Sequence, residues 1–283
     1  SFATNIERAF NFMWEAKHQP PNECQDHPLS VSRDLEKAVD LFKSNRLEEA
    51  CKTARALVAR EPNSFDAIDL LAGILLAQNK LSEAVTAYQK AVTLKPTYAI
   101  GFFNLGVLSK DLEQPDQAVV FYSKAIELDP NMTDALYNRG VSYESLEKHE
   151  EALADYLAAL RLKPRFAEAH NNAGKCLRAL FRFEQSLEHL QRAIEINPDF
   201  DLAYNNLGLT LWLIGQTGAA KGLFDRAIEI NPEYGSAYSN RGMLTERGFR
   251  KCISDFITAI SLDPSDKKNY SSRVLTAHYF PEI

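Results

Sequence analysis

The apolar positions of this chain fall into short amphipathic runs that are typical of α-helices. In "AIELDPNMTDALYNRGVSYESL" (125–146), one apolar run ends at a proline and a second begins a few residues later around a glycine. Similar phrases recur as "AVTLKP", "AALRLKP", "AIEINP" (twice) and "AISLDP". Because the residue before a proline is driven out of the helical region, each phrase predicts the end of one helix and room for the next to begin.

These boundaries repeat with a fixed spacing. Prolines recur every 34 residues, at Pro62, Pro96, Pro130, Pro164, Pro198 and Pro232, and Pro264 follows after 32. A small residue in each first run keeps the same step, at Ala72, Gly106, Gly140, Gly174, Gly208 and Gly242. Two series in the second runs do so as well, from Ala84 to Cys252 and from Ala91 to Ala259. Four series in register predict a solenoid of stacked helix pairs.

The small residues predict close contact between the two helices of a pair. A glycine inside a helix costs about 1 kcal/mol relative to alanine, so the glycine series indicates a steric requirement. Large side chains follow the Ala84 series by four positions, one turn further along the same face. They are Tyr88, Tyr122, Tyr156, Leu190, Phe224 and Phe256. We expect these side chains to fill the space that the small residues leave.

Helix pairs of 34 residues with this arrangement of small, aromatic and proline positions resemble tetratricopeptide repeats. The resemblance covers about residues 31–266, with units at 31–64, 65–98, 99–132, 133–166, 167–200, 201–234 and 235–266. It implies an all-α fold, a right-handed α-solenoid of about seven helix-turn-helix repeats. The first unit is the most degenerate, with Ala38 at the glycine position, and the last lacks two residues around 246–251.

The flanking segments are expected to cap the open ends of this solenoid, because each end exposes an apolar face. In residues 1–30, Thr4 and Glu7 form a plausible capping box before a helix with an apolar stripe that includes Phe10 and Trp14. Residues 267–283 predict a terminal helix.

Composition excludes several classes of function. The chain of 283 residues has 32 basic and 38 acidic residues, a formal net charge of -6, which argues against broad binding of nucleic acid. No apolar run is long enough for a transmembrane helix and the first residues do not resemble a secretory signal. The four cysteines match no disulfide or metal-binding spacing, so we predict a reduced, cytoplasmic protein.

No catalytic, cofactor or metal motif is found. The six histidines form no metal-binding motif. The segments "NAGKC" and "GQTGAAK" depart from the phosphate-loop pattern, and Gly174 in the first is the repeat glycine. We therefore predict that the chain is not an enzyme and carries no cofactor.

One polar series points to a binding surface. In the family that the chain resembles, the first helix of each repeat lines the concave wall. Asparagines recur there every 34 residues, at Asn104, Asn138, Asn172, Asn206 and Asn240. An amide both donates and accepts hydrogen bonds, so this asparagine ladder could hold the backbone of an extended peptide. Equally, the asparagines could support hydrogen bonds from helix to helix.

Repeat six departs from its neighbours on the same wall. It places an apolar cluster where repeat five has Glu168, Lys175, Arg178 and Ala179; the cluster is Leu202, Leu209, Trp212 and Leu213. Trp212 lies off the apolar stripe of Tyr204, Leu207, Leu211 and Ile214, so two interpretations stay open: Trp212 anchors a partner, or it packs against the next repeat. The other candidate partner-binding residues are the five asparagines, Lys175, Arg178, Leu209 and Leu213.

Two functional hypotheses follow. The first is a non-enzymatic scaffold that binds a protein or peptide partner in its concave groove, alone or within a multi-protein complex. The carboxylate clamp of chaperone-binding members has no match, so an acidic chaperone tail is not expected there. The second hypothesis rests on the ladder and on "YSSRVLTAHYFPEI" (270–283), which resemble the repeat arm of O-linked N-acetylglucosamine transferase-like enzymes. It makes the chain the substrate-recruiting arm of such a glycosyltransferase, with the catalytic domain expected beyond residue 283.

Overall fold

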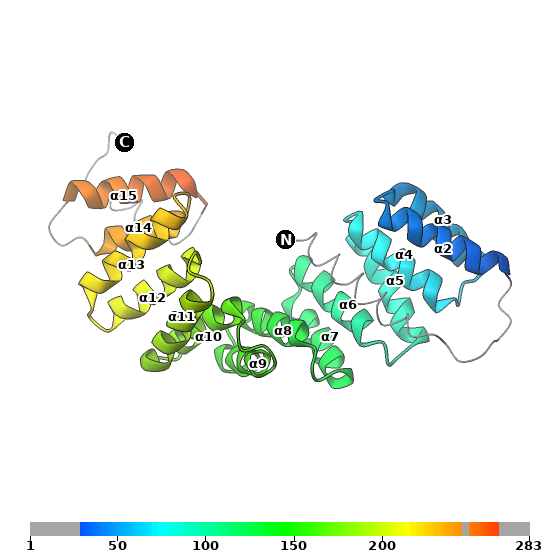
Figure 1. The fold of residues 1–283 in the computed structure, drawn as a ribbon, viewed down its shortest axis with the longest axis horizontal. Coiled ribbons are helices and arrows are strands. Elements are labelled where there is room, and N and C mark those ends of the chain that lie inside the picture. The colour runs from blue at the N-terminus through cyan, green and yellow to red at the C-terminus, as the bar shows by residue number, and fades with distance from the viewer. Residues whose placement is uncertain (1–28, 245–248, 266–283) are drawn as a thin grey trace. The chain divides into compact units, whose positions relative to one another are not determined.

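The computed structural model describes residues 29–244 and 249–265, and within these ranges every regular element is an α-helix (Figure 1). The prediction of an all-α fold is therefore confirmed. The helices are α2 (Leu29–Lys43), α3 (Leu47–Arg60), α4 (Phe65–Ala77), α5 (Leu81–Leu94), α6 (Ala99–Asp111), α7 (Pro115–Leu128), α8 (Thr133–Ser145), α9 (His149–Leu162), α10 (Ala167–Ala179), α11 (Phe183–Ile196), α12 (Asp201–Leu213), α13 (Thr217–Ile230), α14 (Gly235–Met243) and α15 (Phe249–Leu262).

The chain divides into two compact units, residues 1–146 with α2 to α8 and residues 147–283 with α9 to α15. Within each unit, every helix packs against the next one in sequence. The first helices of neighbouring repeats also touch, α2 with α4 and α6 with α8 in unit 1, and α10 with α12 in unit 2. Contacts limited to near neighbours in sequence are the packing of a solenoid.

The described helices form seven pairs, one pair in each predicted repeat, except that α2 begins two residues ahead of residue 31. The expected N-terminal helix and C-terminal helix lie outside the described residues. So does the expected shortened turn of the last repeat, at residues 245–248.

Each repeat ends its helices in a recurring way. The second helix ends two residues before the proline, and the capping residue between them is extended or nearly so, as at Asp129 and Asn197. The first helix is closed by a residue with positive φ, at Asn45, Asn79, Glu113, Glu147, Phe181 and Gly215. After α4, the Lys80 N–H donates to the Leu75 carbonyl and the Asn79 N–H donates to the Leu76 carbonyl, which is the Schellman pattern of helix termination.

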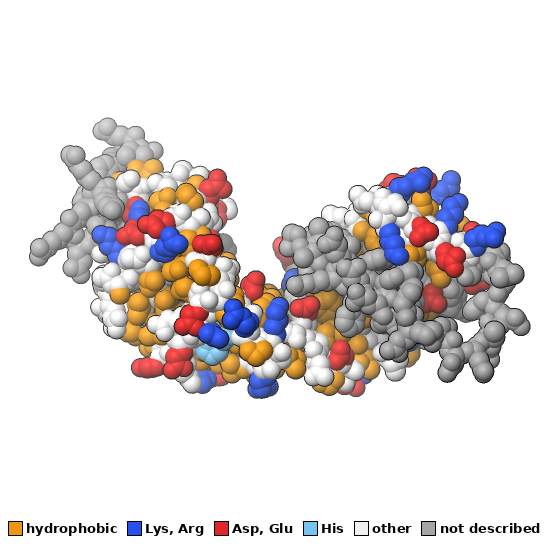
Figure 2. All heavy atoms as spheres, in the orientation of Figure 1, with side chains coloured by type: hydrophobic (Ala, Val, Ile, Leu, Met, Phe, Trp, Pro, Cys, Tyr) orange, Lys and Arg blue, Asp and Glu red, His pale blue; other side chains and the backbone are white. Residues whose placement is uncertain are grey.

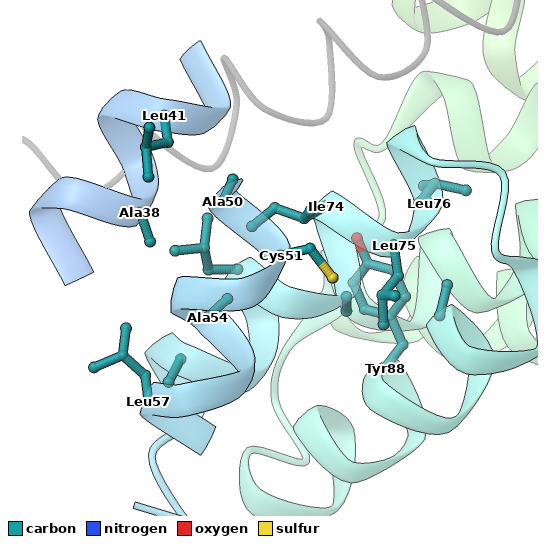
Figure 3. Close-up of a cluster of buried hydrophobic side chains, with 14 of the residues drawn as sticks. Ala38, Leu41, Ala50, Cys51, Ala54, Leu57, Ile74, Leu75, Leu76 and Tyr88 are labelled. Carbon is teal, nitrogen blue, oxygen red and sulfur yellow. The ribbon is translucent and has the colours of Figure 1, made fainter. Parts of the chain in front are cut away.

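The interior of unit 1 is a layer of small and aliphatic side chains between helix pairs. Figure 3 shows α2 contributing Ala38 and Leu41, α3 contributing Ala50 and Cys51, and α5 contributing Tyr88. Cys51 in this layer and Cys176 in α10 are buried free thiols.

Three glycines of the repeat series lie directly against a ring of the partner helix. A Cβ built on Gly106 would lie 2.6 Å from the Tyr122 ring, and one on Gly208 would lie 2.7 Å from Phe224. Gly242 would meet Phe256 at 2.8 Å. Since real Cβ atoms do not approach other atoms this closely, the glycines are required by the approach of the two helices, as the sequence predicts.

Gly208→Ala is expected to destabilise unit 2 by roughly 1–3 kcal/mol, the usual cost of overpacking. Phe224 is fully buried, and a Cβ at position 208 would lie 2.7 Å from its ring. Urea unfolding followed by circular dichroism measures the change.

Gly222→Ala is the matched control, because Gly222 lies inside α13 and a Cβ there would meet nothing within 4 Å. It should stabilise the protein by up to about 1 kcal/mol through helix propensity. Equal effects of the two substitutions would contradict the steric account.

Candidate functional site

A pocket of about 750 Å³ opens in unit 2 along the first helices of three successive repeats. We call it the α10–α12–α14 pocket. Four lining residues come from α10, four from α12 and most of the rest from α14 with its capping residue Tyr234. They are Asn171, Asn172, Lys175, Arg178, Leu202, Asn205, Asn206, Leu209, Tyr234, Ser236, Ser239, Asn240 and Met243, with the buried Phe256 of α15.

The repeat spacing produces this pocket. Its lining residues fall at equivalent positions of the three helices: 171, 205 and 239, then 172, 206 and 240, then 175, 209 and 243. Because the repeats stack in register, one face of each first helix supplies the same positions to the common surface. The side chains at the third position differ, being Lys175, Leu209 and Met243, and so give the pocket a polar end and an apolar end.

Amide hydrogen bonds connect the three helices. The Asn206 side chain donates from Nδ2 to Oδ1 of Asn171 at 2.9 Å, and Asn240 donates in the same way to Asn205 at 2.7 Å. Each bond runs from one repeat to the preceding one. For Asn206 and Asn240, the structure therefore supports the helix-to-helix interpretation of the asparagine ladder.

Asn172 is bonded differently from these two. Its Nδ2 faces the Tyr156 hydroxyl at 3.4 Å, and its Oδ1 accepts a bond from Asn171 at 3.1 Å. Its side chain remains half-buried beside the pocket. The Asn172 amide is therefore already held in position by Tyr156 and Asn171 before any partner binds.

Arg178 spans the gap between α10 and α12. Its NH1 donates to the Asn206 backbone oxygen at 3.1 Å and lies 3.3 Å from Asn206 Oδ1. In unit 1, Lys110 makes the corresponding contact with Asn138 Oδ1 at 3.4 Å, across the same separation of 28 residues. A cation near the end of one first helix thus binds the ladder asparagine of the next.

The predicted site residues do not all come together. Asn172, Asn206, Asn240, Lys175, Arg178 and Leu209 line the pocket. Asn104 is 2% exposed inside unit 1, so its amide lies in the core. Asn138, also in unit 1, donates from Nδ2 to the Asp134 carbonyl of its own helix at 2.8 Å.

Trp212 and Leu213 lie outside the pocket lining. Trp212 is half-buried and packs against a cluster of Ala220, Phe224 and Leu244, the last of which follows α14. The structure therefore supports the interpretation that Trp212 packs against the next repeat. The apolar stripe assumed from sequence is wrong at Ile214, which caps α12 and is 37% exposed because the helix has ended before it.

Sequence reasoning missed several lining residues. Asn171 and Asn205 precede ladder positions, and the doublet "NN" at 171–172 and 205–206 was a signal that could have found them. Tyr234, Ser236, Ser239 and Met243 carried no such signal, because their types vary between repeats.

Neither charge sign dominates the face of the described residues that Figure 2 draws. Figure 2 shows acidic and basic side chains interspersed on the visible face, without one continuous basic patch. Within the described part of the chain, no helix is long and apolar enough to cross a membrane.

Stacked helix pairs whose first helices share a lined surface define a class of α-helical repeat proteins. Models described as tetratricopeptide repeat match residues 99–132, 133–166 and 202–234, and a TPR repeat model matches 73–113 and 174–215. Together these matches cover more than half of the 283 residues. The chain belongs to the tetratricopeptide repeat family.

Solved structures agree with this assignment. A tetratricopeptide repeat protein from Parabacteroides merdae is similar at a TM-score of 0.67 and 19% identity, covering 86% of this chain and 96% of that one. A repeat protein from Cytophaga hutchinsonii gives 0.65 and 17%, covering 84% and 98%. YrrB, a repeat protein with an unusual peptide-binding site, gives 0.52 and 26%, covering 67% and 98%. No curated protein sequence matches significantly.

Trp212→Ala should destabilise the protein by roughly 1–3 kcal/mol, less than the 3–5 kcal/mol typical of a fully buried aromatic residue. Thermal unfolding checks this. Leu213→Ala is the control, because Leu213 is 53% exposed and exposed positions usually change stability by less than about 0.5 kcal/mol. If Trp212→Ala were as mild as the control, the packing interpretation would fail.

Asn206→Ala should cost roughly 1–3 kcal/mol, because it removes the donor to the buried Asn171 Oδ1 and the Oδ1 contact of Arg178. Asn206 itself is only 9% exposed. Asn172→Ala should cost less, since its side chain is half open to water. Denaturant unfolding gives the free energy of unfolding of both variants. If Asn206→Ala were as stable as the parent chain, Asn206 would have no structural role.

Proposed function

We propose that this protein is a non-enzymatic interaction scaffold that binds an extended segment of a protein partner in the α10–α12–α14 pocket. The observation that carries the proposal is the composition of the pocket lining: two cations at one end, amides in the middle and exposed apolar side chains beside them. A preformed groove on a repeat array is suited to an extended chain.

The apolar part of the pocket supports binding of a large side chain. Leu202 is 43% exposed and Met243 is 49% exposed, although both line a concave surface. Large apolar groups left open in a concavity gain free energy when a partner covers them. Methionine also adapts its shape to different apolar groups. We infer that a leucine, methionine or aromatic side chain of the partner binds here.

The charged part of the pocket supports an acidic partner. Lys175 and Arg178 both line it, and none of its lining residues is Asp or Glu, although acidic residues outnumber basic ones in the chain. The hydrogen bonds from Arg178 to Asn206 hold the guanidinium at the pocket wall. A partner carboxylate near Lys175 and Arg178 would complement this charge.

YrrB supports a peptide as the class of ligand, since it is a family member with a peptide-binding site and is 26% identical to this chain. The alternative of a transferase arm is not proposed. Asn206 and Asn240 of the asparagine ladder are engaged in hydrogen bonds between repeats. The terminal segment on which this alternative also rests, residues 270–283, lies outside the described residues.

We infer a reducing, cytoplasmic location, with the protein acting alone or in a larger complex. The buried free thiols of Cys51 and Cys176 support this location.

Selection of a displayed random peptide library on the full chain tests the proposal. The selected peptides should combine Asp or Glu with a Leu, Met or aromatic residue. Lys175→Glu and Met243→Ser should each weaken binding of a selected peptide about tenfold or more, which is ~1.4 kcal/mol. Fluorescence polarisation measures these affinities.

Lys221→Glu is the matched control, because Lys221 is exposed on α13 and does not line the pocket. It makes the same charge change and should leave affinity nearly unchanged. If all three variants bind alike, or if selection yields no acidic and apolar preference, the pocket is not the binding site.

A further inference from the structure

Two histidines of repeat five lie side by side, with their rings tilted by 42°, outside the pocket lining. His170 of α10 and His189 of α11 have their Nδ1 atoms 3.1 Å apart and their ring centroids 5.1 Å apart. Both side chains are half-buried, so the pair is reachable from solvent. The two residues come from the two helices of one pair, which are held together by their own packing.

The surroundings of His170 fix which of its nitrogens is available. Its Nε2 lies 3.2 Å from the backbone carbonyl of Pro164, which can only accept a hydrogen bond. In the neutral ring the hydrogen is therefore on Nε2, and the lone pair of Nδ1 points to His189. Histidines that bind metal ions commonly donate their second N–H to a carbonyl in this way.

We propose that His170 and His189 form a binding site for one divalent transition-metal ion of the zinc class. Imidazole nitrogens suit Zn²⁺, Ni²⁺ and Cu²⁺. Two nitrogens bound to Zn²⁺ at about 2.0–2.1 Å in a tetrahedron are ~3.3 Å apart, so the observed pair needs to open by only a few tenths of an ångström.

Binding needs no change in the total number of protons. In the unliganded pair, the Nδ1–H of His189 donates to Nδ1 of His170. When the ion binds, that hydrogen moves by solvent exchange to Nε2 of His189, and both Nδ1 lone pairs face the metal. Burial lowers the pKa of both imidazoles, which keeps them in the neutral form that binds metal.

The neighbouring charges and the ligand count define the site further. Glu188 attracts a cation near His189, whereas Arg192 opposes one near His170. In the described part of the chain no group of three or more His, Cys, Asp or Glu residues could hold an ion. Water therefore completes the coordination, and the affinity is expected to be micromolar. The bound ion would link α10 to α11 and so stabilise repeat five.

Isothermal titration of the chelator-treated full chain with zinc chloride tests the site. We expect one additional Zn²⁺ bound per chain relative to the His170→Gln/His189→Gln variant, and a zinc-dependent rise in melting temperature that this variant lacks. Glutamine keeps the size and hydrogen bonding of the side chain, and circular dichroism checks that the variant folds. His189→Gln alone should weaken zinc binding at least tenfold.

His149→Gln, which changes a histidine outside the pair, is the control and should bind zinc as the parent chain does. Magnesium chloride should give no heat, because Mg²⁺ prefers oxygen ligands. Cobalt chloride should give visible absorption bands that the double variant lacks, a signal that a purely structural histidine pair would not produce. Undiminished zinc binding by the double variant, or no binding by the parent chain, would overturn the proposal.

Discussion

The small residue near the middle of each first helix determines how closely the two helices of a repeat approach each other. At Gly106, Gly208 and Gly242 a ring of the second helix occupies the space of the missing side chain. This contact fixes the separation of the pair without any special bond. Because each pair then packs only on its neighbours, one local constraint repeated along the chain sets the position of each first helix within its unit.

The chemistry of the pocket follows from that regularity. Equivalent positions of α10, α12 and α14 meet on one surface, so a change at one of them alters one place in the lining. The Asn206–Asn171 and Asn240–Asn205 bonds stabilise this surface between repeats. Lys175, Leu209 and Met243 show how the same position then gives each repeat a different contact for a partner.

The sequence predicts the helices well and the pocket only in part, for a physical reason. Proline, glycine and aromatic positions act within one repeat, and their 34-residue spacing identifies them directly. Burial of an amide depends on its neighbours in other repeats, so Asn104 and Asn206 occupy equivalent positions with different surroundings. The pattern of its own helix leaves both interpretations of Trp212 open, because the deciding contact, with Leu244, belongs to the next repeat.

The central claim, that contact between the first-helix glycine and the aromatic ring sets the geometry of each repeat, is tested most directly by a double-mutant cycle of Gly208→Ala with Phe224→Ala. Native-state hydrogen exchange of the α12 and α13 amides gives the local opening free energy in all four proteins. The account predicts that the added methyl group costs stability only when the ring is present, with a coupling energy of about 1–3 kcal/mol. Effects that add to within about 0.5 kcal/mol would contradict it.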